Sequence, residues 1–212
     1  MNSGPTSPSR MDPESRKELL VQATLRCLKQ HGFQGTSVRR ICAEADVSVG
    51  LINHHYASKD DLVAETYQHL TGTILKRLRT AMEKAGQNRR RQLTAFFVAS
   101  FADDILDPTL LEAWIAFWGA VRSTSAMSEA HDASYSEYRA VLSKCLNELA
   151  SELGWLNFDA NLAAISLSAL LDGLWLESGL NPKTFTPAQG IQMCEAWVDG
   201  IVCGGYRTYC PA

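Results

Sequence analysis

The sequence lacks the features that mark membrane and secreted proteins. No apolar run approaches the roughly 20 residues that a helix needs to span a bilayer. The N-terminal residues MNSGPTSPSRMDP contain no apolar segment like that of a secretory signal, and their composition favours a disordered arm over residues 1–12. We therefore expect a cytoplasmic protein that does not interact with membranes.

Motifs for metal binding, cofactor binding and catalysis are also missing. The six cysteines show no metal-ligand spacing and most lie inside helical patterns, so reduced thiols are the favoured interpretation. The sequence has no nucleophile elbow and no phosphate-binding loop, and the adjacent His54 and His55 would point to different sides of a helix. We expect no catalytic residue, no metal ion and no cofactor. An enzyme built on these histidines, or on Asp172 and Glu177, is left as an alternative.

Positive charge is scarce and unevenly placed. The chain carries a net charge of −3, but residues 1–59 carry a net charge of +3 and residues 60–212 a net charge of −6. A basic N-terminal part on an acidic body favours contact with phosphates at one end only. The overall acidity argues against a protein that coats nucleic acid.

Two short amphipathic helices are predicted within residues 36–59, TSVRRICAEADVSVGLINHHYASK. Thr36 and Ser37 are candidate N-caps for the first helix, and Ser48 is a candidate for the second. Asp46 falls where the chain must turn, and aspartate tolerates the left-handed backbone conformation better than most residues. Small and hydrogen-bonding side chains occupy the outward face of the second helix. This pattern indicates a helix-turn-helix, whose second helix enters the major groove of DNA.

This segment resembles the DNA-binding signature of the TetR family of bacterial transcriptional regulators. Three positions depart from the family pattern: Asp46 replaces the turn glycine, Cys42 replaces an alanine, and Asn53 replaces a tyrosine that usually contacts phosphate. The resemblance implies a homodimer that binds a palindromic operator in double-stranded DNA and responds to a small-molecule effector. The matching residues are Thr36, Ile41-Cys42, Ala45-Asp46-Val47-Ser48, Gly50, Asn53-His54-His55-Tyr56 and Lys59.

The candidate DNA contacts lie at the helix starts and on the outward face of the second helix. Hydroxyl and cationic groups near helix N-termini suit phosphates, whereas asparagine and valine side chains can read an adenine or thymine edge. The phosphate candidates are Thr36, Ser37, Arg39, His55 and Lys59. The base-reading candidates are Val49, Asn53 and His54, with Ser48 and Gly50 at the start of the recognition helix.

The rest of the chain is also predicted to be helical. We expect an all-α protein, with a three-helix DNA-binding domain over residues 13–58 and a helical bundle for ligand binding and dimerisation over residues 59–212. A helix expected over residues 159–179 is apolar nearly all round, so it needs cover on more than one side. The family resemblance implies that a partner subunit supplies this cover, and the alternative is that the helix is the core of a monomer. The other helices are expected over residues 13–31, 58–84, 92–104, 107–122, 128–153 and 187–202, with a polar break over 87–91.

Tryptophans mark the candidate effector site. Trp114 and Trp118 lie four residues apart and so share a helix face, with Phe117 beside them. Trp175 follows Asp172 at a spacing of three residues. Tryptophan faces with a carboxylate suit an organic cation, especially a quaternary ammonium. Large aromatic residues at helical spacing are, however, more often core residues.

The strings LEAWIAFWGA and DGLWLE also resemble segments of a narrower subgroup, the BetI-type choline-responsive repressors. This resemblance implies a repressor that an organic cation such as choline releases from its operator. A helical small-molecule-binding protein without DNA-binding activity is the alternative.

Overall fold

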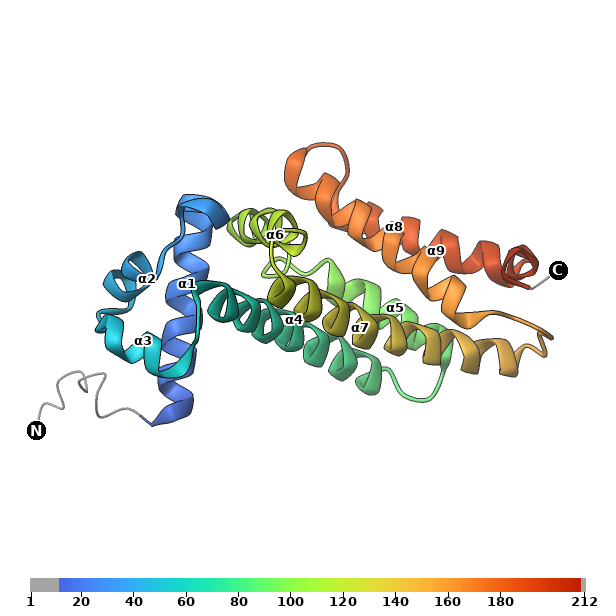
Figure 1. The fold of residues 1–212 in the computed structure, drawn as a ribbon. Coiled ribbons are helices and arrows are strands. Elements are labelled where there is room, and N and C mark those ends of the chain that lie inside the picture. The colour runs from blue at the N-terminus through green and yellow to red at the C-terminus, as the bar shows by residue number, and fades with distance from the viewer. Residues whose placement is uncertain (1–11, 211–212) are drawn as a thin grey trace, which may run out of the picture. The chain divides into compact units, whose positions relative to one another are not determined.

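The computed structural model describes residues 12–210, except for the side chains of residues 108 and 109. The arm expected over residues 1–12 lies outside the described residues, apart from Asp12. The described chain folds into α-helices and a short 3-10 helix, without strands, which confirms the all-α class (Figure 1). The elements are α1 (Pro13–Gly35), α2 (Val38–Ala45), α3 (Val49–His55), α4 (Lys59–Lys84), α5 (Arg89–Ser100), α6 (Pro108–Val121), α7 (Ser125–Glu152), α8 (Ala160–Leu180), α9 (Pro187–Val202) and η2 (Gly205–Tyr209).

The chain divides into two compact units. Unit 1 comprises the residues up to Thr71 together with Thr109–Ala133, so it contains α1 to α3, the first half of α4, nearly all of α6 and the start of α7. Unit 2 comprises Gly72–Pro108 and the residues from Ser134 onward, which include α5, α8 and α9. The helices α4 and α7 therefore each contribute to both units.

The N-terminal part of unit 1 folds around the apolar faces of its first three helices. Leu20 of α1, Ile41 of α2 and Ile52 of α3 are each at most 1% exposed. They form one cluster together with Cys27 of α1 and Leu62 of α4. The apolar face predicted from the helical spacing of the sequence is therefore the buried face, and its packing holds α2 and α3 against α1.

The helix α1 begins and ends at sequence signals. The Asp12 side chain accepts a hydrogen bond of 3.0 Å from the backbone N–H of Ser15 and so caps the helix. Gly32 has a φ of 63° and interrupts the helical backbone. The predicted helix stop at this glycine is confirmed, and one further turn continues to Gly35.

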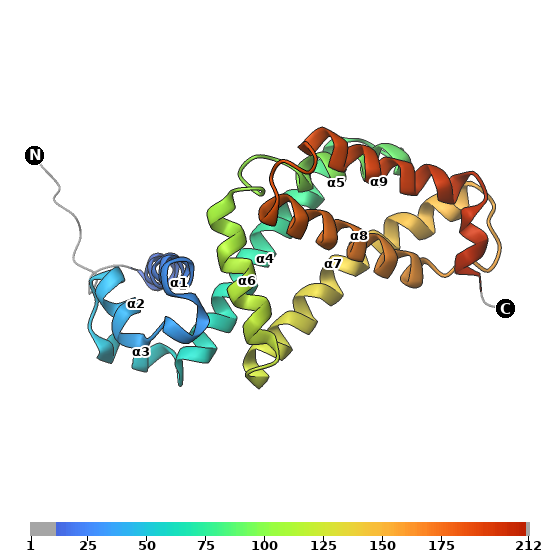
Figure 2. The same cartoon turned by 90° about the horizontal axis from the view of Figure 1, so that it is seen from above.

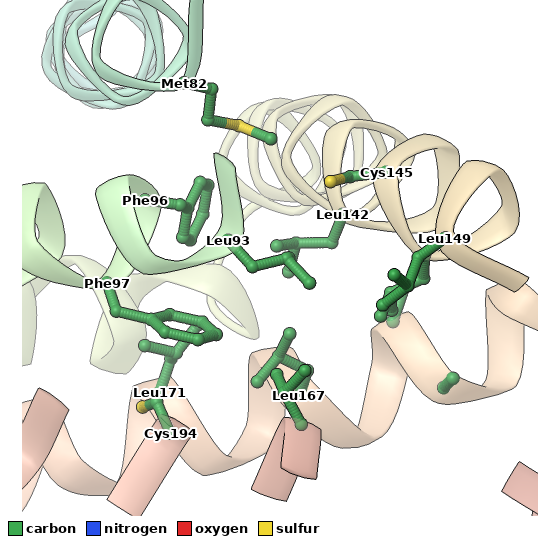
Figure 3. Close-up of a cluster of buried hydrophobic side chains, with 14 of the residues drawn as sticks. Met82, Leu93, Phe96, Phe97, Leu142, Cys145, Leu149, Leu167, Leu171 and Cys194 are labelled. Atoms are coloured by element: carbon green, nitrogen blue, oxygen red, sulfur yellow. The ribbon is translucent and has the colours of Figure 1, made fainter. Parts of the chain in front are cut away.

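Unit 2 has a core of its own, which α4, α5, α7, α8 and α9 build together (Figure 3). Leu142, Cys145, Leu146 and Leu149 of α7 follow the spacing i, i+3, i+4 and i+7, and each is at most 5% exposed. Figure 3 shows Leu142, Cys145 and Leu149 in one cluster with apolar side chains of the other helices, including Leu93, Phe96, Phe97, Leu167 and Leu171.

The arginine-rich segment that was expected to be a polar break is the first turn of α5. The Asn88 side chain caps this helix by accepting a hydrogen bond of 2.9 Å from the backbone N–H three residues later. Arg89 pairs with Glu148 of α7 at 2.9 Å, and Arg90 pairs with Asp199 of α9 at 2.7 Å. The predicted break is confirmed at residues 87 and 88, which lie between α4 and α5, and is wrong for residues 89–91, because charged side chains that interrupt the apolar pattern find partners on neighbouring helices.

The helix α8 is long and apolar enough, by length and composition alone, to cross a membrane, with a mean hydropathy of 1.2. The expectation that no apolar run approaches this length is therefore wrong, although an ordinary core helix passes the same test. Leu167 and Leu171 of α8 are buried in the core of unit 2. Leu162 and Ile165 on another face are 47% and 49% exposed, which confirms that α8 is apolar on more than one side.

Candidate nucleic-acid interface and effector residues

The turn between α2 and α3 follows from two residues, Asp46 and Ser48. Asp46 has a φ of 52° and a ψ of 48°, which is the left-handed conformation predicted for this position, and it ends α2. The Ser48 side chain accepts a hydrogen bond of 3.3 Å from the backbone N–H of Leu51 and so caps α3. Ser37 caps α2 in the same way. The predicted turn residue and both of these caps are confirmed.

The outward face of α3 carries side chains that can read base edges. Val49 is 42% exposed, and Asn53, His54 and His55 are also exposed. Ile52 of the same helix is 1% exposed, so α3 is held by one apolar side and presents the rest of its surface to solvent. The structure thus gathers the predicted base-reading residues on the exposed side of one short helix.

Gly50 in the first turn of α3 has no packing partner that would require a glycine. An added Cβ atom would meet nothing nearer than the Ser48 Oγ atom at 3.9 Å, which is ordinary van der Waals contact. The residue is also exposed. Core packing therefore does not require a glycine here. The absence of a side chain at Gly50 leaves the backbone of α3 uncovered at this point of the outer surface.

The side chains of two candidate phosphate ligands contact the end of α1. Thr36 is 3% exposed, and its hydroxyl donates a hydrogen bond of 2.7 Å to the carbonyl oxygen of Gly32. The Lys59 Nζ atom lies 3.4 Å from the carbonyl oxygen of Phe33 and 4.0 Å from the centroid of the Phe33 ring. Both side chains hold the last turn of α1. For Thr36 the expectation of a phosphate contact is corrected, because its hydroxyl is buried in this conformation.

The other phosphate candidates are open to solvent. Ser37, Arg39 and His55 are all exposed. Arg40 is exposed as well and donates a hydrogen bond to the carbonyl oxygen of Gly35. The start of α2 and the end of α3 therefore both offer polar groups at the surface of unit 1.

The effector candidates of α6 pack against a tyrosine of α4 within unit 1. The ring centroid of Tyr67 lies 5.7 Å from that of Trp114 and 5.2 Å from that of Phe117, both in edge-to-face geometry. Tyr67 and Phe117 are fully buried and Trp114 is 6% exposed. Trp118 is half-buried, with its ring centroid 6.3 Å from that of Trp114. These rings form a packed aromatic cluster with Trp118 at its edge.

Tyr67 also has a polar partner in unit 1. Its hydroxyl oxygen lies 3.0 Å from the Nδ1 atom of His131, and this hydrogen bond joins α4 to α7. The role of Tyr67 is not predictable from the sequence, because a single tyrosine in a helical apolar pattern gives no signal for partners that lie far along the chain.

In unit 2, Asp172 is a partly buried carboxylate with an aromatic partner. The Tyr135 hydroxyl donates a hydrogen bond of 2.9 Å to the Oδ2 atom of Asp172. Burial raises the pKa of Asp172 to about 6, against the Tyr135 hydrogen bond and the Arg139 charge, which both lower it. The Tyr135 and Tyr138 ring centroids are 6.3 Å apart. A carboxylate beside aromatic rings is a setting that favours an organic cation.

Trp175 is half-buried in unit 2, and its indole N–H donates a hydrogen bond of 3.1 Å to the carbonyl oxygen of Ser100. The predicted effector residues therefore fall into two groups with separate neighbours, one in each unit. Within residues 12–210, no group of three or more His, Cys, Asp or Glu side chains could hold a metal ion. All six cysteines are free thiols, which agrees with the predicted reduced state.

The sequence matches two family descriptions. Residues 20–66 match "Bacterial regulatory proteins, tetR family", and residues 89–202 match "BetI-type transcriptional repressor, C-terminal". The HTH-type transcriptional regulator BetI of Burkholderia ambifaria is 27% identical over 191 residues, which cover 88% of this chain and 93% of that protein. BetI of Paraburkholderia xenovorans is 26% identical over 193 residues, which cover 89% of this chain and 94% of that protein.

Solved structures show the same similarity. The crystal structure of a transcriptional regulator from Pseudomonas aeruginosa PAO1 is 63% identical, with a TM-score of 0.93 over 96% of this chain and 98% of that chain. FadR from Bacillus subtilis, solved in complex with stearoyl-CoA, shares the fold at 16% identity, with a TM-score of 0.72 over 88% of this chain and 98% of that chain.

Proposed function

The chain belongs to the TetR family of bacterial transcriptional regulators, with a C-terminal part of the BetI type, and we propose that it is a repressor that binds its operator as a dimer until a small molecule releases it. As a member of this family it is a DNA-binding regulator of transcription and not an enzyme. The observation that carries the proposal is the exposed surface of α3, where Val49, Asn53 and His54 are open to solvent while Ile52 is buried.

Operator recognition is assigned to two sets of exposed side chains. The amide of Asn53 can form two hydrogen bonds with an adenine edge, and the Val49 side chain can pack against a thymine methyl group. Gly50 lets the backbone of α3 approach the DNA closely. Phosphate contacts are assigned to Ser37, Arg39 and His55, which fix the orientation of the helix without reading sequence.

The dimer interface is assigned to α8 and α9, which contact each other and lie side by side in both views (Figures 1 and 2). Each helix has an exposed stripe of apolar and small residues at spacings of three or four. An added Cβ atom at Gly173 or Gly200 would meet nothing within 4 Å, so a partner helix could pack closely there. The stripe residues are Leu162, Ile165, Ala169 and Gly173 of α8, and Met193, Ala196 and Gly200 of α9.

An organic cation is the proposed effector. Asp172 of unit 2 supplies a negative charge beside the aromatic rings of Tyr135 and Tyr138 of the same unit. The name BetI of the similar proteins points in the same direction, since the BetI-type resemblance implies choline. Release from DNA requires that the effector bind the DNA-free conformation more tightly than the DNA-bound one.

A gel shift with DNA from upstream of the gene tests the DNA-binding part. Operator binding should weaken steeply as salt rises, because phosphate contacts release counterions. Asn53→Ala should weaken binding to the preferred fragment by roughly 1–3 kcal/mol. Asn147→Ala, which removes another exposed helical asparagine from α7, should leave binding unchanged. If the protein binds none of the DNA fragments in a salt-sensitive way, the alternative of a small-molecule-binding protein without DNA-binding activity is favoured.

Calorimetry tests the effector. Choline and tetramethylammonium are the cationic probes, and stearoyl-CoA, the ligand in the Bacillus subtilis FadR structure, is an anionic comparison. The proposal requires that choline or tetramethylammonium binds and that Asp172→Asn weakens this binding. Binding of stearoyl-CoA alone, or cation binding that Asp172→Asn leaves unchanged, would show that the effector is of another class.

A further inference from the structure

Tyr135 of α7 has two charged neighbours within unit 2. Its hydroxyl donates a hydrogen bond of 2.9 Å to the Oδ2 atom of Asp172 on α8. The guanidinium of Arg139 lies over its ring, with the Cζ atom 5.7 Å from the ring centroid. Tyr135 and Arg139 are four residues apart on α7, a spacing that places them on the same face of the helix. The tyrosine therefore contacts a carboxylate and a cation at the same time.

The charge of Arg139 also reaches Asp172. Burial raises the pKa of Asp172 to about 6, and the positive charge of Arg139 acts against this rise because it stabilises the ionised carboxylate. Arg139 therefore interacts both with the ring of Tyr135 and with the negative charge of Asp172. These are the two groups to which binding of the effector is assigned.

An organic cation from solution would use the same groups as Arg139. A guanidinium and a quaternary ammonium are both attracted to the face of an aromatic ring. The side chains of Tyr135, Tyr138, Arg139 and Asp172 are all half-buried, so each keeps some contact with solvent. Two cations on one ring and beside one carboxylate would repel each other, because they carry like charges at short range. Arg139 and an external cation therefore exclude one another from this place.

The contact with Tyr135 holds Arg139 only loosely. The distance of 5.7 Å is close to the outer limit of about 6 Å for a cation–π contact. Arg90 of the same unit, by contrast, pairs with Asp199 at 2.7 Å. Within residues 12–210, Arg139 forms no such ion pair. An external cation can therefore displace the Arg139 guanidinium without breaking a salt bridge.

We propose that Arg139 is a built-in competitor of the effector, which occupies the ring of Tyr135 in the effector-free protein and is displaced when an organic cation binds. This competition rests on the proposed function, because it takes the effector to be a cation that binds beside Asp172. It adds a residue that sets the affinity of the site. A cation binds only if it interacts with the ring and the carboxylate more strongly than the Arg139 side chain does.

Calorimetry with choline and tetramethylammonium tests the competition in the full-length protein at pH 7.5, where Asp172 is mostly ionised. Arg139→Gln removes the competing guanidinium and should tighten choline binding about fivefold, the gain expected when a partly exposed cation–π contact no longer has to be broken. Lys144→Gln is the matched control, because it removes an exposed positive charge from another face of the same helix. It should leave the affinity unchanged.

Nuclear magnetic resonance observes the displacement itself. Protons that lie over the face of an aromatic ring resonate upfield, so the side-chain protons of Arg139 should be shifted upfield in the effector-free protein. Their resonances should return towards the positions of an unstacked arginine as choline is added. The spectrum of the effector-free protein tests the contact between Arg139 and Tyr135 whether or not a cation is the effector.

The outcomes separate the competition from the proposed effector. If choline binds the wild type and Arg139→Gln binds it no more tightly than Lys144→Gln does, the competition is overturned and the cationic effector stands. Loss of choline binding in Arg139→Gln also overturns the competition, because Arg139 would then help to form the site. If neither the wild type nor Arg139→Gln binds choline or tetramethylammonium, the cationic effector and the competition fail together.

Discussion

The hydroxyl of Tyr135 donates a hydrogen bond of 2.9 Å to the carboxylate of Asp172 and so joins α7 to α8 inside unit 2. This bond and the charge of Arg139 favour the ionised carboxylate, but burial opposes it more strongly and raises the pKa of Asp172 to about 6. The folded protein therefore holds a proton on Asp172 at a pH where the unfolded chain has lost it.

This shift predicts that Asp172→Asn stabilises the protein at neutral pH. The unfolded carboxyl ionises near pH 3.8 and the folded one near pH 6, so the wild-type free energy of unfolding falls as pH rises through this interval. Asparagine cannot ionise and avoids this loss. Urea unfolding from pH 4 to pH 7.5 should show the variant gaining up to about 3 kcal/mol relative to the wild type.

The matched control is Asp132→Asn, which replaces an exposed carboxylate on α7. Its free energy of unfolding should follow that of the wild type across the same pH range. A gain by Asp172→Asn that does not change with pH would show that the carboxylate is not the source of the effect.

A second prediction concerns the turn of the helix-turn-helix. Asp46 adopts the left-handed conformation, which costs a residue with a Cβ atom more than it costs glycine. Asp46→Gly should therefore raise the free energy of unfolding by roughly 0.5–1 kcal/mol while operator affinity is retained. Thermal unfolding measures the gain. Asp132→Gly, inside the right-handed helix α7, should instead destabilise by a few tenths of a kcal/mol, and equal effects of both changes would contradict the explanation.

The features that the sequence predicted best are those that local chemistry decides. Ser37 and Ser48 cap helices through bonds to backbone groups three residues away, and Asp46 turns the chain through its own dihedral angles. Gly32 ends a regular helix for the same local reason. Such features need only a short window of sequence, so the DNA-binding motif could be predicted in detail.

The features that the sequence did not reveal depend on partners far along the chain. Thr36 and Lys59 were expected to face phosphates, yet the end of α1 supplies carbonyl oxygens that both of them meet. The partner of Arg90 lies on α9, more than a hundred residues later, so its segment read as a break in the helical pattern. The spacing of the tryptophans predicted a shared helix face correctly but not the packing of Trp114 against Tyr67.

A third prediction separates folding from DNA binding at Gly50. Alanine fits this position, since only the Ser48 Oγ atom lies within 4 Å of the added Cβ atom. Gly50→Ala should therefore leave the protein as stable as the wild type, or more stable by up to about 1 kcal/mol. Operator affinity should nevertheless fall, because the added methyl group would protrude from α3 and keep its backbone farther from the DNA.

Thermal unfolding and a gel shift on the same sample measure the two effects of Gly50→Ala. The same substitution at Gly119, also a helical glycine with open space around it, should change stability in a similar way and leave operator affinity unchanged. Undiminished operator binding by Gly50→Ala would mean that α3 does not approach the DNA through this residue.

The last prediction tests the interface assigned to α8 and α9. Ile165 is 49% exposed in a single chain and lies in the middle of the α8 stripe. Ile165→Arg would bury a charge without a partner if that stripe is covered by a second subunit, which costs several kcal/mol. Each ~1.4 kcal/mol weakens association tenfold, so the dimer should dissociate at concentrations where the wild type stays paired.

Sedimentation measures the oligomeric state of Ile165→Arg, and Val98→Arg serves as the control, because Val98 of α5 is 52% exposed but lies outside the stripe. The free energy of unfolding of an Ile165→Arg monomer then reports whether unit 2 remains folded without a partner subunit. Operator affinity should fall together with dimerisation, since a palindrome is read by two recognition helices at once. A dimer that survives Ile165→Arg and dissociates with Val98→Arg would move the interface away from α8.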